Sequence, residues 1–171
     1  KKNYITKGVD TDWMSQPLQN QFNHSHSLYI SGGTEGFRFG TDLSYNHEGG
    51  VMKKSYRNRM SVGIYVDYRV GKLQIRNNVS YDLARSSDSP YGSFSDYTKQ
   101  QPYYPIYDDN GKLLQMLAIG IPNPLYEATL GNFSRGESSN LTNNLSFYWF
   151  INDHLQLQSQ FSVTKNDSED K

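Results

Sequence analysis

The sequence predicts an all-β chain, an antiparallel meander of about six strands that forms part of a larger membrane-spanning barrel. Three observations support this fold class. Apolar and polar residues alternate with period 2, the connections between the alternating runs are short and long in turn, and aromatic residues are abundant in a polar chain. Of 171 residues, 35% are hydrophobic and 14% are aromatic. Disordered chains are normally poor in aromatic residues, so we expect a folded protein.

Period-2 alternation is typical of a strand whose two faces meet different surroundings. It is clearest over residues 56–69, where every even position from Met60 to Tyr68 is apolar. The same pattern predicts the other strands near residues 26–31, 36–46, 72–83, 140–151 and 155–164. One face of the sheet should carry Val62, Ile64, Val66, Ile75, Val79, Leu145, Phe147 and Phe161, and the other Ser61, Asp67, Gln74, Arg76, Gln158 and Gln160.

The connections alternate in length along the chain. Short ones are expected at residues 31–36, 70–71 and 152–154, and longer ones at 47–55 and 84–139. Short turns on one side and long loops on the other are typical of outer-membrane barrels, in which the long loops are extracellular. We therefore expect an extracellular loop over residues 84–139.

Aromatic residues of the apolar face are expected at the two ends of the strands. Tyr45 and Tyr81 come next to the long loops, whereas Tyr68 and Trp149 come next to the short turns. Aromatic rings favour the two interfaces of a bilayer, so these residues predict two girdles. Ordinary hairpin aromatics in a soluble β-protein are the competing interpretation.

Strand register follows from keeping the apolar residues on one face. An even turn at Val70-Gly71 places Tyr68 opposite Leu73 and Arg59 beside Asp82. The second hairpin needs a three-residue connection, Asn152-Asp153-His154, which places Trp149 opposite Leu157. Such loops usually contain a left-handed residue, so Asp153 or His154 should have a positive φ. The polar face, facing the barrel lumen, should include Arg59, Asp67, Arg76 and Asp82.

Several function classes find no support in the sequence. Lys+Arg and Asp+Glu are balanced at 17 each, which gives no attraction for nucleic acid, and there is no Cys. No nucleophile elbow, zinc-protease motif or phosphate loop occurs, so we expect neither an enzyme nor a cofactor. His24 and His26 have no third ligand close by, so they predict a lumen-facing or solvated pair and no metal site.

Short motifs in a fixed order resemble those of a known family. A Thr11-Asp12-Trp13 element is followed by His26-Ser27-Leu28-Tyr29-Ile30-Ser31-Gly32-Gly33 and then by Tyr45-Asn46-His47-Glu48-Gly49-Gly50-Val51. Further on come Tyr103-Tyr104-Pro105-Ile106-Tyr107-Asp108-Asp109-Asn110-Gly111, Asn123-Pro124-Leu125 and Asn143-Asn144. Together these segments resemble the SusC/RagA family of outer-membrane transporters, although His26 stands where the family pattern has Asn.

The resemblance implies a bacterial outer-membrane importer of glycan fragments or peptides. Such a transporter is a barrel of about 22 strands that is plugged by an N-terminal domain, energised through TonB and capped by a SusD-like surface lipoprotein. Membrane lipid would surround it. This chain would then be a partial barrel domain over residues 1–171, with the plug domain, the TonB-contacting part and the remaining strands outside it.

Aromatic residues in the long loop are candidates for contact with substrate or with the lipoprotein, because rings beside polar groups suit sugars and peptides. They are Tyr91, Phe94, Tyr97, Tyr103, Tyr104 and Tyr107. Packing of the loop is the alternative role for them. For the whole chain the main alternative is a soluble or surface-attached glycan-binding β-domain, and a passive porin or adhesin barrel is a third possibility.

Overall fold

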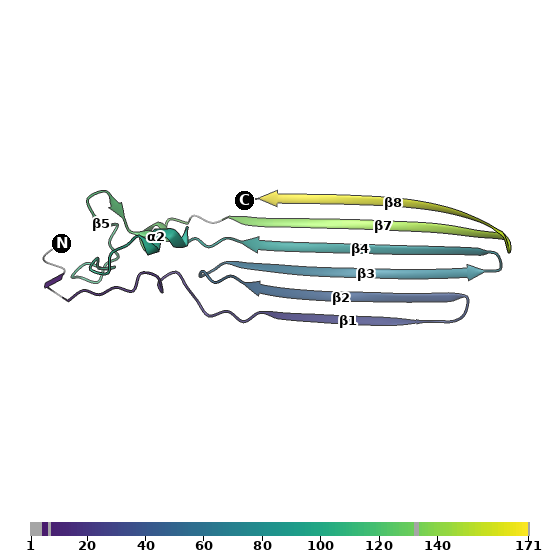
Figure 1. Cartoon of the computed structure of the whole chain (residues 1–171), viewed down its shortest axis with the longest axis horizontal. Helices are drawn as coiled ribbons and strands as arrows, with labels where there is room; N and C mark the ends of the chain where they lie inside the picture. Colours follow the sequence, from purple (N-terminus) through teal and green to yellow (C-terminus); the bar gives the residue numbers. More distant parts are fainter. Residues whose placement is uncertain (1–4, 7, 132–133, 171) are drawn as a thin grey trace.

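Six long strands form one antiparallel sheet in the order β1-β2-β3-β4-β7-β8 (Figure 1). The computed structural model describes residues 5–6, 8–131 and 134–170. The strands are β1 His24–Gly33, β2 Phe37–Gly49, β3 Tyr56–Val70, β4 Leu73–Ser87, β7 Arg135–Asn152 and β8 Leu155–Asp170. Each strand pairs with the next long strand along the chain, so the sheet is a meander. The predicted all-β meander is confirmed, and the sheet does not close on itself.

Long and short connections lie at opposite ends of the sheet (Figure 1). Strands β4 and β7 run past their predicted ends to Ser87 and from Arg135, so their connection covers residues 88–134 rather than 84–139. This connection is not featureless. It contains the helices α2 Phe94–Thr98 and α3 Pro124–Glu127 and the small hairpin of β5 Met116–Ala118 and β6 Ile121–Pro122. No helix in the described ranges is both long and apolar enough to cross a membrane.

The two faces of the sheet separate the residues as predicted. Partners across neighbouring strands share a face, and the apolar face carries rows such as Leu28–Leu43–Val62–Tyr81–Leu141. The polar face carries Tyr65 beside Asn78 and Asp67 beside Arg76. Both predicted sets keep to their own side, which confirms the alternation argument. The apolar face is strongly exposed, with Ile30 at 51%, Ile64 at 50% and Phe161 at 60%.

One polar pair interrupts the apolar face. Asn77 and Asn143 lie on it in the middle of β4 and β7, and the Asn143 amide donates a hydrogen bond to the Asn77 side-chain oxygen at 3.2 Å. The two residues are diagonal neighbours, because Asn77 pairs with Leu145 and Asn143 with Val79. Each amide therefore satisfies part of the other's hydrogen-bonding capacity on a predominantly apolar surface.

The predicted register of the β3–β4 hairpin was wrong by two residues. The structure pairs Val70 with Leu73 and Tyr68 with Ile75, so the turn residues are Gly71 and Lys72. Arg59 consequently lies opposite Ala84 and not beside Asp82, which pairs with Ser61. A shift by two keeps every side chain on its face, so the face assignments survive this error.

The β7–β8 hairpin keeps the predicted residues on one face, but it does so through a bulge and not through the predicted three-residue connection. Trp149 lies opposite Leu157 and Leu145 opposite Phe161, as predicted. However, the register shifts between Phe150 and Asn152, and Asn152 pairs with Leu155 across Asp153 and His154. A bulge at Ile151 therefore supplies the odd residue. The prediction of a positive φ at Asp153 or His154 was wrong, since Lys54 is the one non-glycine residue with positive φ among those described.

Two short turns at the same end of the sheet differ in how strictly they require glycine. At Gly33 (φ 145) an added Cβ would lie 2.1 Å from the Phe37 carbonyl oxygen, whereas at Gly71 (φ 56) it would meet nothing within 4 Å. We expect Gly33→Asn in the full-length protein to lower the free energy of unfolding by about 1–3 kcal/mol through the clash. Gly71→Asn should be nearly neutral, because asparagine tolerates the left-handed region. Denaturant titration of both variants checks this, and equal stability would contradict it.

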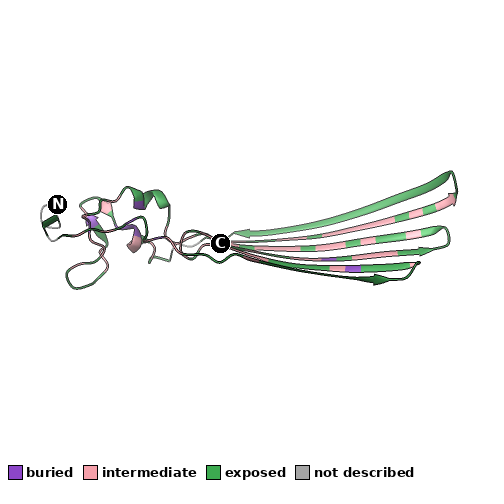
Figure 2. Ribbon diagram, turned by 60° about the horizontal axis from the view of Figure 1, so that its bottom comes forward, coloured by how far each residue is buried: buried purple, intermediate pink, exposed green. Residues whose placement is uncertain are grey.

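Buried side chains gather outside the sheet. We call the residues 88–131 together with the N-terminal segment 9–18 the loop body. Figure 2 shows the strands mostly exposed and the loop body holding most of the buried positions. Its core consists of Trp13, Tyr97, Tyr104 and Leu117, which are at most 5% exposed. The site described next lies between this body and the sheet.

Candidate ligand pocket between the loop body and the sheet

The N-terminal segment is held against the long connection by specific hydrogen bonds. The Thr11 backbone N–H donates to the Pro102 carbonyl at 2.8 Å, and the Thr11 hydroxyl donates to the Tyr104 carbonyl at 2.8 Å. The Trp13 indole N–H donates to the Gln101 carbonyl at 3.2 Å. The Thr11-Asp12-Trp13 motif thus joins segments about 90 residues apart, as the sequence separations of 88 and 93 in these bonds show.

A buried asparagine organises the second half of the connection. The Asn123 side chain, which is fully buried, donates to the Leu114 carbonyl at 2.7 Å and accepts from the Leu125 N–H at 3.0 Å. It therefore caps α3 and ties this helix to residue 114. The Asp108-Asp109-Asn110-Gly111 segment forms a turn, as expected, in which the Asp108 carboxylate accepts from the N–H groups of Asn110 and Lys112.

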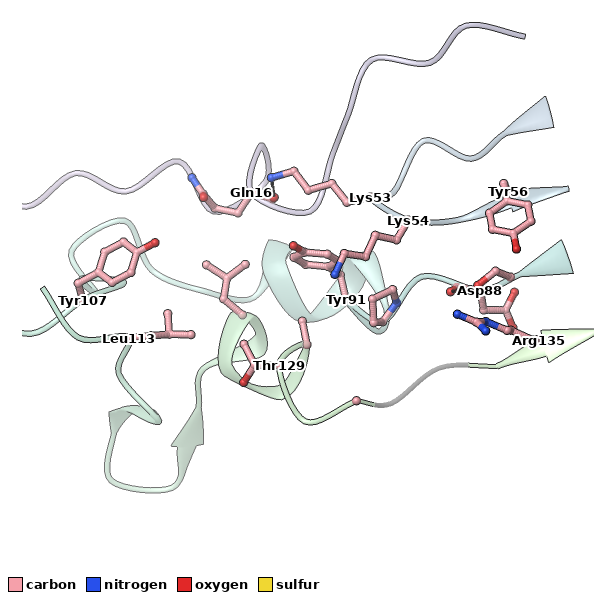
Figure 3. Close-up of a pocket in the computed structure, with 15 residues that line it drawn as sticks. Gln16, Lys53, Lys54, Tyr56, Asp88, Tyr91, Tyr107, Leu113, Thr129 and Arg135 are labelled. Carbon is pink, nitrogen blue, oxygen red and sulfur yellow. Dashed lines mark hydrogen bonds between the residues drawn. The ribbon is translucent and has the colours of Figure 1, made fainter. Parts of the chain in front are cut away.

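A cavity of about 730 Å³ opens where the loop body meets the ends of β3, β4 and β7 (Figure 3). Its sheet end is polar, with Lys54, Tyr56, Asp88 and Arg135. Its other end, toward Tyr107, also contains Leu113. A cavity of this size is in the range of small-ligand sites. We call it the loop pocket.

Positive charge prevails in the loop pocket, in a chain whose total charge is balanced. Lys53, Lys54 and Arg135 line it against one carboxylate, that of Asp88. Lys53 is already engaged, because its ammonium group donates to the Gln16 carbonyl at 2.6 Å and lies 5.8 Å from the centre of the Tyr91 ring. In Figure 3 the Lys54 side chain extends over the pocket toward Tyr91.

Lys54 adopts an unusual backbone conformation. Its φ of 65° lies in the left-handed region, which non-glycine residues other than Asn, Asp and His rarely enter. The surrounding connection enforces it: Ser55 N–H donates to the Met52 carbonyl, and Gly50 N–H donates to the Ser55 carbonyl. Strained residues of this kind are concentrated at functional sites, which makes Lys54 a candidate.

The polar face of the sheet carries a second ordered cluster near the short turns. The Asp67 carboxylate accepts hydrogen bonds from Gln74 (2.7 Å), Tyr65 (2.9 Å) and Arg76 (3.0 Å). The Arg76 guanidinium also lies 5.1 Å from the centre of the Tyr148 ring. Arg59 and Asp82 lie on the same face, where Arg59 pairs with Glu48 at 3.7 Å and Asp82 accepts from Ser61 at 2.6 Å. All four predicted lumen residues thus share one face, but they form three separate pairings.

The predicted contact aromatics lie in different surroundings. Tyr97 and Tyr104 are 0% and 5% exposed and form part of the core of the loop body. Burial raises the pKa of the Tyr97 phenol. Tyr103 packs against the same core with its ring 4.8 Å from that of Tyr104. Tyr91 and Tyr107 line the loop pocket, whereas Phe94 is exposed on α2 outside it.

Sequence reasoning missed the charged lining of the pocket. Lys53 and Lys54 come from the β2–β3 connection and Arg135 from the start of β7, which are far apart in sequence. The adjacent Lys53 and Lys54 in this connection were the signal that the sequence offered. Of the two positions expected for His24 and His26, solvated or lumen-facing, the lumen-facing one was wrong, because both share the face of Leu28 and Tyr45, and the His24 ring stacks on His47 at 5.1 Å. Among the described residues no group of three metal-binding side chains is positioned for a metal.

These features define the class of the chain: an open wall segment of an up-and-down antiparallel barrel, apolar on one face and polar on the other, with an elaborated loop body at one end. Comparison with protein-family models and with curated proteins gave no match. Comparison with solved structures gave clear similarity to the RagAB peptide transporter, with 18% sequence identity, 95% coverage of this chain and a TM-score of 0.74.

Two further structures agree. The RagAB peptide importer in the closed-closed state is 20% identical over 94% of this chain, with a TM-score of 0.74, and in the open-open state 19% identical over 94%, with a TM-score of 0.75. The predicted resemblance to the SusC/RagA family is therefore confirmed for the fold. The chain spans about one fifth of the length of these transporter chains, 19–20%.

Proposed function

We propose that this chain is a wall segment of a TonB-dependent importer in the bacterial outer membrane, which takes up peptides or glycan fragments together with a SusD-like lipoprotein. The observation that carries the proposal is the two-faced six-stranded meander, whose backbone matches RagAB chains over 94–95% of its length. Within this proposal the apolar face meets lipid, the polar face lines the lumen, and the loop body is extracellular. The segment itself carries out no chemical step.

The exposed apolar face favours this proposal over a soluble glycan-binding domain. Large side chains on β1, β2, β3 and β8 are 42–60% exposed, namely those of Leu28, Leu43, Ile64 and Phe161. A large exposed apolar surface of this kind marks a membrane or protein contact. Aromatic rings near the short turns, Phe37, Tyr68, Phe147 and Trp149, lie on this face at the level expected for an interfacial girdle.

The name of the structural neighbours favours peptides over glycan fragments as the cargo, and the test compares the two. Cells that carry the full-length parent protein are given a fluorescent peptide mixture or a fluorescent oligosaccharide mixture, and uptake is measured with and without an uncoupler of the inner membrane. We expect uptake of peptides that the uncoupler abolishes. A passive pore would give uptake that is insensitive to the uncoupler, and a soluble domain would show no heat-modifiable gel mobility.

A variant of the loop pocket tests whether this segment contributes to the proposed uptake. We expect Tyr107→Ala to lower uptake several-fold, because Tyr107 is 55% exposed and lines the loop pocket, and to leave heat-modifiable mobility unchanged. Phe94→Ala is the matched control, since Phe94 is an exposed aromatic residue of the same connection outside the loop pocket. Equal uptake by both variants and the parent would remove the loop pocket from the proposal.

A further inference from the structure

The loop pocket combines an excess of positive charge with an apolar end, and this combination selects a particular ligand. Lys54, from the β2–β3 connection, and Arg135, the first residue of β7, lie at the sheet end, and Tyr107 and Leu113 lie at the far end. A ligand that fits both ends carries an anionic group and a separate apolar body. Guanidinium and ammonium groups bind carboxylates through charge-assisted hydrogen bonds.

The arrangement of the two lysines indicates which of them can bind the anionic group of the ligand. Lys53 is held by the Gln16 carbonyl and the Tyr91 ring, so it stabilises the wall of the pocket. Lys54 is held by its backbone in the left-handed region, and its side chain is exposed over the pocket. The Lys53 ammonium group is thus bound to the protein. The hydrogen bond from the Gly50 N–H to the Ser55 carbonyl maintains the backbone conformation that directs the Lys54 side chain over the pocket.

We propose that the loop pocket binds acidic peptide segments, with carboxylates held by Lys54 and Arg135 and an apolar side chain toward Tyr107 and Leu113. This inference rests on the proposed function, because it names which peptides the importer prefers. The three tyrosines of the lining, Tyr56, Tyr91 and Tyr107, supply amphipathic surface for a peptide backbone and its side chains.

Calorimetric titration of the purified full-length parent in detergent tests the proposal. The probe is a blocked hexapeptide with two aspartates and two phenylalanines, and its counterpart has asparagines in place of the aspartates. We expect the acidic peptide to bind roughly ten-fold more tightly at low salt, as two charge-assisted contacts allow. The preference should shrink between about 0.05 M and about 0.5 M NaCl as the charges are screened.

Variants locate the preference in the pocket. Lys54→Asn removes the charge and tolerates the left-handed φ, and combined with Arg135→Gln it should abolish the preference for the acidic peptide. Lys54→Arg should retain it, which separates charge from backbone effects. Lys112→Met is the control, because Lys112 is an exposed lysine of the loop body outside the pocket. Heat-modifiable mobility verifies that every variant is folded.

Each remaining outcome has a defined meaning. Equal affinity of the parent for both peptides, or an unchanged preference in the double variant, would overturn this inference and leave the proposed importer in place. Binding of trigalacturonate with neither peptide bound would show that the carboxylate recognised belongs to a sugar, and would overturn the peptide assignment. Absence of peptide uptake by cells carrying the parent would instead overturn the peptide part of the proposed function.

Discussion

Ile64→Arg in the full-length protein will lower the free energy of unfolding by about 2–4 kcal/mol, the range for arginine on the lipid face near the bilayer midplane. Ile64 is 50% exposed on the apolar face and lies midway along β3 between Met60 and Tyr68, the ends of its apolar run. These residues are separated by about 26 Å at roughly 3.3 Å per residue, close to the thickness of an apolar band.

The matched control places the same charge on the other face at a similar depth. Asn78 is exposed on the polar face, where it pairs with Tyr65. Asn78→Arg should therefore change stability by less than about 1 kcal/mol, as surface substitutions usually do. Both variants are refolded into lipid vesicles and unfolded with urea. An equal loss of stability in the two variants would contradict the assignment of the apolar face to lipid.

Trp13→Ala will release the N-terminal segment from the loop body. The Trp13 side chain is 3% exposed in the core, and its indole donates to the Gln101 carbonyl. Truncation of a buried tryptophan typically costs about 3–5 kcal/mol. Because the sheet does not depend on this core, the loss should be local: amide protection of residues 9–18 and 97–104 should fall, while that of β3 and β4 stays unchanged.

Hydrogen exchange followed by mass spectrometry measures this loss segment by segment. Trp13→Phe should retain part of the protection, because it keeps a ring but loses the indole donor. Phe22→Ala is the control, since Phe22 is an aromatic residue of the same N-terminal region that is 79% exposed. A loss of protection that extends into the strands would mean that the loop body and the sheet unfold together.

The fold was predictable because the alternation of apolar and polar residues, and the even or odd number of residues in each turn, can be read from short stretches of sequence. Every apolar residue assigned to one face, from Val62 to Phe161, lies there. The same rule cannot detect a slip by two residues, which keeps each side chain on its face. The β3–β4 turn therefore came out at Val70-Gly71 instead of Gly71-Lys72. In the β7–β8 hairpin the sequence predicted correctly which residues share a face. A bulge and a three-residue loop with a positive φ both give this result, so the sequence could not decide between them.

The candidate site was less predictable, because it depends on contacts between distant segments. Tyr97 and Tyr107 look alike in sequence, yet one is fully buried and the other is 55% exposed. What separates them is the docking of Trp13 and Thr11 on residues 101–104. The pocket cations Lys54 and Arg135 come together only when β2, β3, β4 and β7 are in register. Alternation gives no information on such tertiary contacts.

The hydrogen bond between Asn77 and Asn143 gives β4 and β7 a reference point that alternation lacks. In the proposed hydrocarbon surroundings no water competes for these amides. A slip by two residues that places Asn77 opposite Phe147 would therefore separate the two amides and leave both with unmet donors and acceptors. The opposite slip places Asn77 directly across from Asn143 and keeps the two amides in contact. The amide pair thus disfavours slippage in one direction, although the hydrophobic pattern accepts both displaced alignments equally.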